Sequence, residues 1–195
     1  MNIGIDIDNV ISNFNEVLKE EFLKHDKELR NTGIVNPNLH MTQGMFDWSE
    51  DEIYGFYKKN IERIAKNLEV KPGAKKYIDK LKEDGHRIVI ITGRDNGEYT
   101  DPFNMTEKWL KEKEIKYDKL ILTNVYTNRL AKAEICFENN IDIMIDDSKH
   151  NCRSCMENNI TTLLMDTPYN RTEKDMIRVN NWEEVYEFIK NYKRE

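Results

Sequence analysis

The sequence has no apolar run approaching the roughly 20 residues that a membrane-spanning helix needs. Its first residues enter an Ile-rich segment directly, without the charged and apolar regions of a signal peptide. Internal repeats and low-complexity segments are also missing. These absences lead us to expect a cytoplasmic protein that does not bind membranes.

Cysteine is scarce. The chain has three cysteines, Cys136, Cys152 and Cys155, and this odd number does not indicate a disulfide framework. A structural zinc site would need two further ligands at a matching spacing, and the four histidines form no such motif. The pair in "CRSC" falls inside an expected helix, whereas redox pairs usually open one. We expect buried or incidental thiols, with a redox or metal role as the open alternative.

Positive charge is in deficit. Lys and Arg total 30 against 36 for Asp and Glu, which gives a formal net charge of -6. This balance argues against a stable complex with a long nucleic-acid backbone, although a local basic pocket for one phosphate remains compatible with it. A small phosphorylated metabolite is therefore a better candidate partner than a duplex.

What the sequence does contain is an alternation of short apolar runs and helical segments. Runs of this kind are typical of parallel strands that are covered on both faces, with the helical segments as crossovers. The pattern predicts an α/β fold in which a Rossmann-like parallel sheet forms the middle of three layers. The expected strands are Ile3–Ile7, Arg87–Thr92, Lys119–Thr123, Ile141–Asp146 and Thr161–Met165.

One interval breaks this alternation. Roughly eighty residues separate the first strand from Arg87, far more than one crossover requires. Residues 13–29 and 48–68 have the pattern of two amphipathic helices, the second with Ser49 as N-cap and Glu52 completing a capping box. Residues 34–45 form an irregular link. We expect a small helical cap, residues 15–69, inserted into a catalytic core of residues 1–14 and 70–195.

Ligands of open parallel sheets bind outside the carboxyl ends of the strands, so the residues that end each strand are the candidate site. A D-x-D pair can equally be a turn or a helix N-cap, and the rest of the chain has to decide. Four carboxylates, a hydroxyl and an ammonium at one edge fit a divalent cation and a phosphoryl group. The candidates are Asp6, Asp8, Thr92, Gly93, Arg94, Lys132, Asp146 and Asp147.

In order and spacing, these motifs resemble the haloacid dehalogenase-like phosphohydrolases. The four family motifs match "DIDNV", "ITGR", the lysine Lys132 and "MIDDS". Within that family, the expected cap, "TEKWLKEKEIKYDKLIL" and "MDTPYNR" with "RVNNWEEVYEFI" resemble cytosolic-type 5'(3')-deoxyribonucleotidases and their bacterial relatives. Asn9 stands where many of these nucleotidases have Gly, and "TGR" replaces their more usual second motif, which leaves the substrate open.

The resemblance implies roles for the core residues. Asp6 is the expected nucleophile, which forms an aspartyl-phosphate, and Asp8 is the expected general acid and base. Thr92 and Lys132 are expected to hold the phosphoryl oxygens where negative charge concentrates.

The resemblance also implies a Mg²⁺ cofactor. Its expected ligands are the Asp6 carboxylate, the Asp8 backbone carbonyl and one or both of Asp146 and Asp147.

Further substrate contacts are less defined by the sequence. Arg94, next to Gly93, can fork onto phosphate or pair with a neighbouring acid such as Asp95. Among the cap aromatics, Phe14, Phe46 or Trp48 can stack on a base, whereas their helical spacing equally suits the core of the cap.

The sequence thus predicts a magnesium-dependent phosphatase that hydrolyses a small phosphate monoester, with a nucleoside (deoxy)monophosphate as the favoured substrate. The alternatives are a sugar phosphate or a nucleic-acid 3'-phosphate end. A phospho-receiver or non-catalytic domain fits less well, because a receiver lacks a cap and a dead enzyme would be expected to lose Asp6, Asp8 or Lys132. A P-loop enzyme is excluded, since no G-x-x-x-x-G-K-[ST] motif occurs. The oligomeric state is not indicated.

Overall fold

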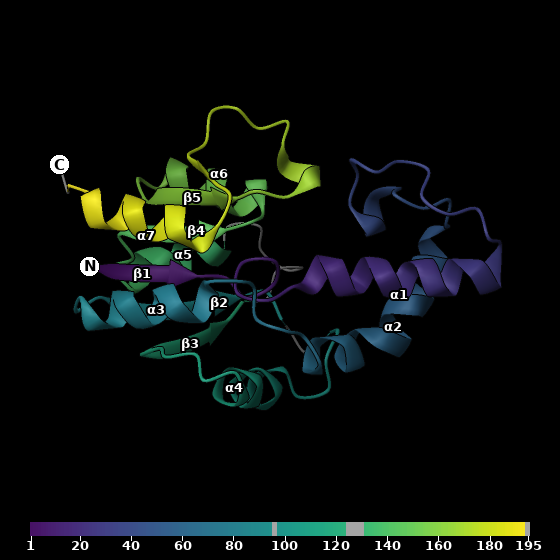
Figure 1. The fold of residues 1–195 in the computed structure, drawn as a ribbon, viewed down its shortest axis with the longest axis horizontal. Helices are drawn as coiled ribbons and strands as arrows, with labels where there is room; N and C mark the ends of the chain where they lie inside the picture. Colours follow the sequence, from purple (N-terminus) through teal and green to yellow (C-terminus); the bar gives the residue numbers. More distant parts are fainter. Residues whose placement is uncertain (95–96, 124–130, 194–195) are drawn as a thin grey trace.

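The computed structural model describes residues 1–94, 97–123 and 131–193. Its centre is a six-stranded sheet in the order β3-β2-β1-β4-β5-β6, in which every pairing is parallel (Figure 1). This architecture confirms the predicted α/β fold. The strands are β1 (Asn2–Ile5), β2 (Arg87–Thr92), β3 (Lys119–Leu122), β4 (Ile143–Asp146), β5 (Thr161–Met165) and β6 (Arg178–Val179).

The two central strands, β1 and β4, are apolar because helices cover both faces of the sheet. Ile3 pairs with Ile88 of β2 and Ile143 of β4, and none of the three is exposed to solvent. Gly4 allows close packing here, since a Cβ atom at this position would lie 2.7 Å from the sulfur of Met144. The centre of the sheet is therefore tightly packed where β1 carries the chain toward Asp6.

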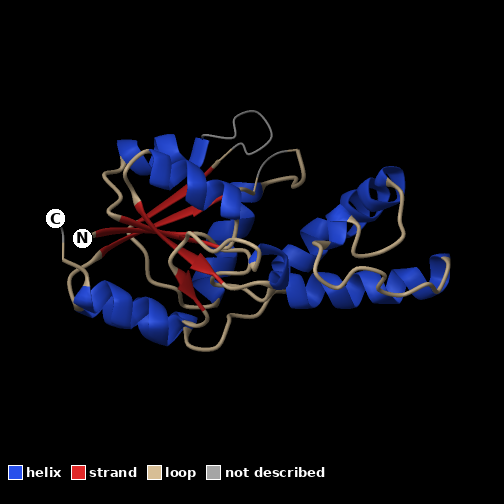
Figure 2. Cartoon of the chain, turned by 90° about the horizontal axis from the view of Figure 1, so that it is seen from above, coloured by secondary structure: helices blue, strands red, loops and turns tan. Residues whose placement is uncertain are grey.

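Helices form the two outer layers (Figure 2). One face is covered by α3 and α7, which contact each other, together with α4, and the opposite face by α5 and α6. All three cysteines are free and buried, and Cys136 and Cys155 belong to the hydrophobic core between the sheet and the α5–α6 layer. The helices are α3 (Ala74–Glu83), α4 (Pro102–Glu112), α5 (Ala131–Glu138), α6 (Lys149–Glu157) and α7 (Trp182–Asn191).

The long interval after β1 forms α1 (Phe14–Leu29), the short 3-10 helix η1 (Met41–Gln43) and α2 (Glu50–Lys66). These elements, which we call the helical projection, extend beyond the carboxyl ends of the strands (Figure 1). Ser49 and Glu52 form the predicted capping box at the start of α2. Within the described ranges, no helix is long and apolar enough to cross a membrane.

The two chain segments that join the projection to the sheet are hydrogen-bonded to each other. The Asn13 backbone N–H donates to the Glu69 carbonyl at 3.0 Å, and the Lys71 N–H donates to the Ile11 carbonyl at 2.7 Å. The Asn13 side chain also accepts from the Glu69 N–H at 2.8 Å. Entry and exit of the projection therefore lie side by side.

Several strand bounds differ from the prediction, since β4 begins at Ile143, two residues later than expected, and β3 ends at Leu122. β1 ends at Ile5, because the Ile7 carbonyl accepts the N–H groups of Val10, Ile11 and Ser12 and so belongs to a turn. The strand β6 was not predicted, since two residues carry no readable alternation; β6 pairs with β5 at the sheet edge.

Candidate active site

The first two candidate acids lie on the turn that follows β1. The Asp6 N–H continues the sheet by donating to the Ile145 carbonyl at 3.0 Å, so the position of Asp6 is fixed by the strand. Asn9 then reverses the chain with a φ of 67°. The Asp6 side chain is 8% exposed, whereas the Asp8 side chain is 22% exposed. The turn therefore places a buried and a more accessible carboxylate close together.

Lys132, near the start of α5, joins the acids of β1 and β4. Its ammonium nitrogen lies 2.7 Å from Asp6 Oδ1 and 2.5 Å from Asp146 Oδ2, and the side chain is 5% exposed. Carboxylate oxygens of Asp6, Asp146 and Asp147 all lie within 4.8 Å of one another. The predicted Lys132 thus bridges two of the three buried acids.

The electrostatics of this cluster favour additional positive charge. Burial raises the pKa of Asp6 well above its usual range, against the opposing effect of Lys132. Burial and the neighbouring Asp146 raise the pKa of Asp147 to about 6. The pKa of Lys132 is also raised, because the attraction of Asp146 and Asp6 outweighs the cost of burying the ammonium. Three carboxylates and one ammonium carry a net charge of -2 when all are ionised, which a divalent cation would neutralise.

Asp146 and Asp147 differ in how many of their oxygens are occupied. Asp146 Oδ1 accepts from the Ser148 N–H at 2.8 Å, Asp146 Oδ2 accepts from Lys132, and Asn151 donates to both oxygens. At Asp147, the hydrogen bonds from Asn9 and Tyr169 both go to Oδ2. Asp147 Oδ1 has no hydrogen-bond partner among the described residues. The donor set therefore fits a hard cation, with Asp147 Oδ1 as its available ligand.

Two threonine hydroxyls lie at the ends of neighbouring strands. Thr92 is fully buried and Thr123 is 3% exposed, and neither Oγ1 has a hydrogen-bond partner in the part of the chain that the structure describes. The two strand ends are joined by a 2.8 Å bond from the Thr123 N–H to the Thr92 carbonyl. Buried hydroxyls without partners are costly, so these groups suit a ligand that supplies the missing bonds. The sequence analysis predicted Thr92 and missed Thr123, although both end a strand.

Arg94 pairs with the acid that is predicted to move protons. Its Nη2 donates to Asp8 Oδ1 at 2.7 Å and its Nε donates to Asp8 Oδ2 at 3.1 Å. The guanidinium carbon lies 5.9 Å from the Trp109 ring centre, and the side chain is 1% exposed. Of the two predicted roles, the structure favours an ion pair with an acid, although this acid is Asp8; Asp95 lies outside the described residues. Gly93, between Thr92 and Arg94, is partly buried.

The cap aromatics that were expected to offer a base platform lie in the hydrophobic core. Phe14, Phe46 and Trp48 are 9%, 2% and 8% exposed. Trp48 stacks on Phe22 with ring centres 4.4 Å apart, and its indole N–H donates to Asp26 at 2.9 Å. Because neighbouring side chains cover these rings, their placement gives no support to base stacking by one of them, which stays a prediction.

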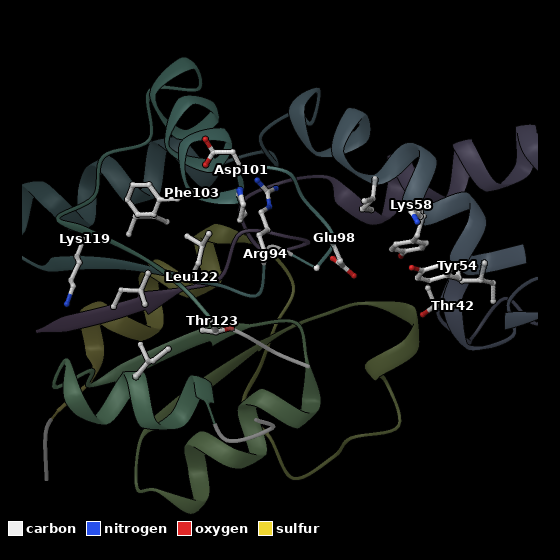
Figure 3. A pocket seen from close by; sticks show the side chains of 18 of the residues that line it. Thr42, Tyr54, Lys58, Arg94, Glu98, Asp101, Phe103, Lys119, Leu122 and Thr123 are labelled. Atoms are coloured by element: carbon white, nitrogen blue, oxygen red, sulfur yellow. The ribbon is translucent and has the colours of Figure 1, made fainter. Parts of the chain in front are cut away.

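A cavity of about 1270 Å³ opens between the projection and the β2–β3 side of the sheet (Figure 3). Tyr54, which is 65% exposed, belongs to the α2 wall of this cavity. Arg94 and Thr123 also line the cavity, which therefore extends to the ends of the strands. Its volume exceeds that of most small-molecule pockets. Other residues that line it are Thr42, Lys58, Glu98, Asp101, Phe103, Lys119 and Leu122.

Sequence reasoning missed the residues that hold Asp147. Tyr169, in the 3-10 helix η2 (Pro168–Asn170), donates its phenolic proton to Asp147, and the Asn9 amide donates to the same oxygen at 2.9 Å. The signal was available, because the polar segment after β5 also follows the carboxyl end of a strand, and the strand-end rule was not extended to it.

The chain is similar to proteins that are named as nucleotidases. The chain is 26% identical over 198 residues to the Bacillus subtilis protein named "Putative nucleotidase YqfW", covering 99% of this chain and 95% of that protein. It is 31% identical over 125 residues to the 5'(3')-deoxyribonucleotidase of Bacillus subtilis, covering 63% of each chain.

The fold is shared with solved structures. A haloacid dehalogenase-like family hydrolase, SP0104 from Streptococcus pneumoniae, superposes with a TM-score of 0.66 at 15% identity, covering 96% of this chain and 97% of that one. The family described as "5' nucleotidase, deoxy (Pyrimidine), cytosolic type C protein" matches residues 1–194. With its D-x-D turn, its buried acids and this nearly complete match, the chain belongs to the cytosolic type C 5'-nucleotidase family.

Proposed function

We propose that this phosphatase hydrolyses a nucleoside (deoxy)monophosphate with Asp6 as the nucleophile and Mg²⁺ as the cofactor. The observation that carries the proposal is the buried group of Asp6, Asp146 and Asp147 around Lys132 at the carboxyl edge of the sheet. The names of the relatives support a nucleotide substrate, and the geometry supports phosphoryl chemistry.

The proposed reaction has two displacements. An Asp6 oxygen attacks phosphorus while the ester oxygen leaves and takes a proton from Asp8, which gives an aspartyl-phosphate and the free alcohol. Asp8 then accepts a proton from the water that attacks this intermediate, which releases phosphate and restores Asp6. Thr92 Oγ1 and the Lys132 ammonium hold the non-bridging oxygens during both steps.

Bound Mg²⁺ would neutralise charge on the phosphoryl oxygens. The residues that fit its binding are Asp6, the Asp8 carbonyl and Asp147 through Oδ1. Asp146 has a different role in this proposal. Its two oxygens are occupied by protein donors, one of which is Lys132, so Asp146 orients the lysine.

We further propose that residues 15–69 act as a cap that selects the substrate. Tyr54 is the candidate platform for a base, because it is the exposed aromatic on the α2 wall of the cavity. A cap over the strand ends would obstruct a polymer more than a mononucleotide, and the net charge of -6 would repel a polyanion. A small nucleotide therefore fits better than a nucleic-acid end.

The test is a panel of phosphate monoesters assayed with Mg²⁺. It contains nucleoside and deoxynucleoside 5'- and 3'-monophosphates, sugar phosphates, a 3'-phosphorylated oligonucleotide and a small aryl phosphate. We expect the highest kcat/KM for a nucleoside monophosphate and no turnover by Asp6→Asn. A sugar phosphate or the oligonucleotide as the best substrate would refute the nucleotidase assignment.

A variant pair tests the base platform. Stacking contributes about 1–3 kcal/mol per base, so Tyr54→Ala should lower nucleotide kcat/KM by roughly 5- to 150-fold and leave the aryl phosphate nearly unchanged. Phe137→Ala is the matched control, because Phe137 is an equally exposed aromatic that is not among the residues lining the cavity. Equal losses on both substrates would assign Tyr54 a structural role only.

A further inference from the structure

The phenolic oxygen of Tyr169 accepts two hydrogen bonds, and its hydroxyl donates one to Asp147. Asn9 Nδ2 lies 3.2 Å and Asn15 Nδ2 lies 3.0 Å from the phenolic oxygen, and both amides donate to it. The single phenolic proton is then directed to Asp147 Oδ2. Burial and the adjacent Asp147 raise the pKa of Tyr169, so the phenol keeps this proton.

Asn9 supplies a second bond to the same carboxylate oxygen. Its Nδ2 lies 2.9 Å from Asp147 Oδ2, and the Asn9 side chain is 5% exposed. Two donors therefore hold Oδ2, and Oδ1 is left without a partner in the described part of the chain. An orientation fixed in this way presents one defined oxygen to the cation and removes the need to order the carboxylate on binding.

The same bonds reach the helical projection. Asn9 Oδ1 accepts the backbone N–H of Asn15 in the first turn of α1 at 2.7 Å. The Tyr169 ring also meets the edge of His40, with ring centres 5.0 Å apart at 89°. A displacement of α1 would thus break bonds to the two groups that hold Asp147.

We propose that Tyr169 and Asn9 are positioning residues for Asp147: their hydrogen bonds hold Asp147 Oδ2, so that Asp147 Oδ1 faces the cation. Through their bonds to Asn15, the same two residues connect cation binding to the start of α1. The proposal rests on the proposed function in that it takes Asp147 as a Mg²⁺ ligand. Asn9→Gly tests it well, because φ is 67° at this position and Gly adopts that conformation without strain. Tyr169→Phe removes only the hydroxyl and keeps the ring against His40.

The experiment measures Mg²⁺ binding to the full chain by titration calorimetry, without substrate. Outer hydrogen-bond partners of metal ligands typically contribute 10- to 100-fold in affinity, so each variant should raise the Mg²⁺ Kd by about that factor. The double variant should lose less than the product of the single losses, because both groups bond to one oxygen.

Matched controls separate positioning from general structural damage. Tyr186→Phe removes a phenol that donates to Asp84 at 2.9 Å, and Asn159→Gly removes an amide at a φ of 58°; both should keep the wild-type Kd. Asp147→Asn should abolish tight binding. If Asp147→Asn does so while Asn9→Gly and Tyr169→Phe stay within twofold of wild type, positioning is refuted and the proposed cation site stands. If Asp147→Asn binds normally, the cation site itself is refuted.

Hydrogen exchange tests the connection to α1. In the wild type and in Asn159→Gly, Mg²⁺ should slow exchange of the backbone amide of Asn15. In Asn9→Gly the acceptor of that amide is gone, and Mg²⁺ should have no effect on it. An equal Mg²⁺ effect in Asn9→Gly would overturn the connection.

Discussion

Mg²⁺ binding should compete with protons at Asp147. The pKa of this carboxyl is about 6 in the metal-free protein, raised by burial and by Asp146. At pH 5 the carboxyl is then roughly nine-tenths protonated, and a cation must displace that proton before it can bind. We therefore expect the apparent Mg²⁺ Kd to be about 10-fold weaker at pH 5 than at pH 7.5, and the raised pKa of Asp6 can only steepen this dependence.

The sign of the stability effect follows from the same shift. A carboxyl pKa that is raised in the folded state means that proton binding stabilises the metal-free protein, and this stabilisation is lost as pH rises through about 6. The shift from 3.8 to about 6 corresponds to about 3 kcal/mol. Burial lowers the pKa of His40 to about 4, so this residue destabilises the folded protein as the pH falls below 6.5. The contribution of His40 is the same with and without Mg²⁺, and it therefore cancels when the two free energies of unfolding are subtracted.

Two measurements check this prediction. Calorimetric titrations in buffers of different ionisation enthalpy should show at least one proton released per Mg²⁺ at pH 5 and fewer at pH 7.5. Urea unfolding should show that the stabilisation by Mg²⁺ over chelator grows between these pH values. An Mg²⁺ Kd that is the same at pH 5 and pH 7.5, with no proton release, would refute the reasoning.

Three further substitutions have defined outcomes. Arg94→Met removes both hydrogen bonds to Asp8, so kcat for a nucleotide should fall by about 10²- to 10⁴-fold. The kcat for an aryl phosphate with a good leaving group should fall far less, and inhibition by inorganic phosphate should not change. Equal losses of kcat on both substrates would indicate that Arg94 binds phosphate instead. Lys132→Met leaves Asp6 and Asp146 without their cation and should lower the free energy of unfolding in chelator by about 3–5 kcal/mol, measured in urea, with partial recovery in Mg²⁺. Ser49→Ala should cost about 1 kcal/mol by the same method through loss of the capping box; an unchanged midpoint would count against that contribution.

The sequence predicted the sheet and most of the catalytic edge because both depend on local signals. Near-continuous apolar runs identify buried parallel strands, and the residues that end them, such as Asp6 and Thr92, meet at one edge whatever the loops do. The capping box of Ser49 and Glu52 was equally readable, since its two partners are three residues apart.

The parts that were not predicted depend on contacts between distant segments. Arg94 and Asp8 are 86 positions apart, whereas the sequence suggested an acid next to the arginine in the chain, such as Asp95. The positions of Phe46 and Trp48, just before α2, do not reveal that the chain between α1 and α2 folds their rings against Phe22. Tyr169 follows the carboxyl end of β5, but the sequence does not show which residue of that polar segment reaches back across 22 positions to Asp147.

The hydrogen-bonded entry and exit hold the two ends of the helical projection together beside the sheet. Since Asn13 bonds to Glu69 and Ile11 bonds to Lys71, the chain returns to nearly the point at which it left, and the two crossings stay together however long the excursion is. Loop-closure entropy grows only slowly with length, so the entropic cost of closing this excursion changes little when the segment between these bonds is lengthened or shortened. Grafts that keep Asn15, whose backbone N–H and side chain bond to Asn9 and Tyr169, and that end before Glu69 therefore mark the boundaries at which new specificities can be engineered on the same strand-end acids.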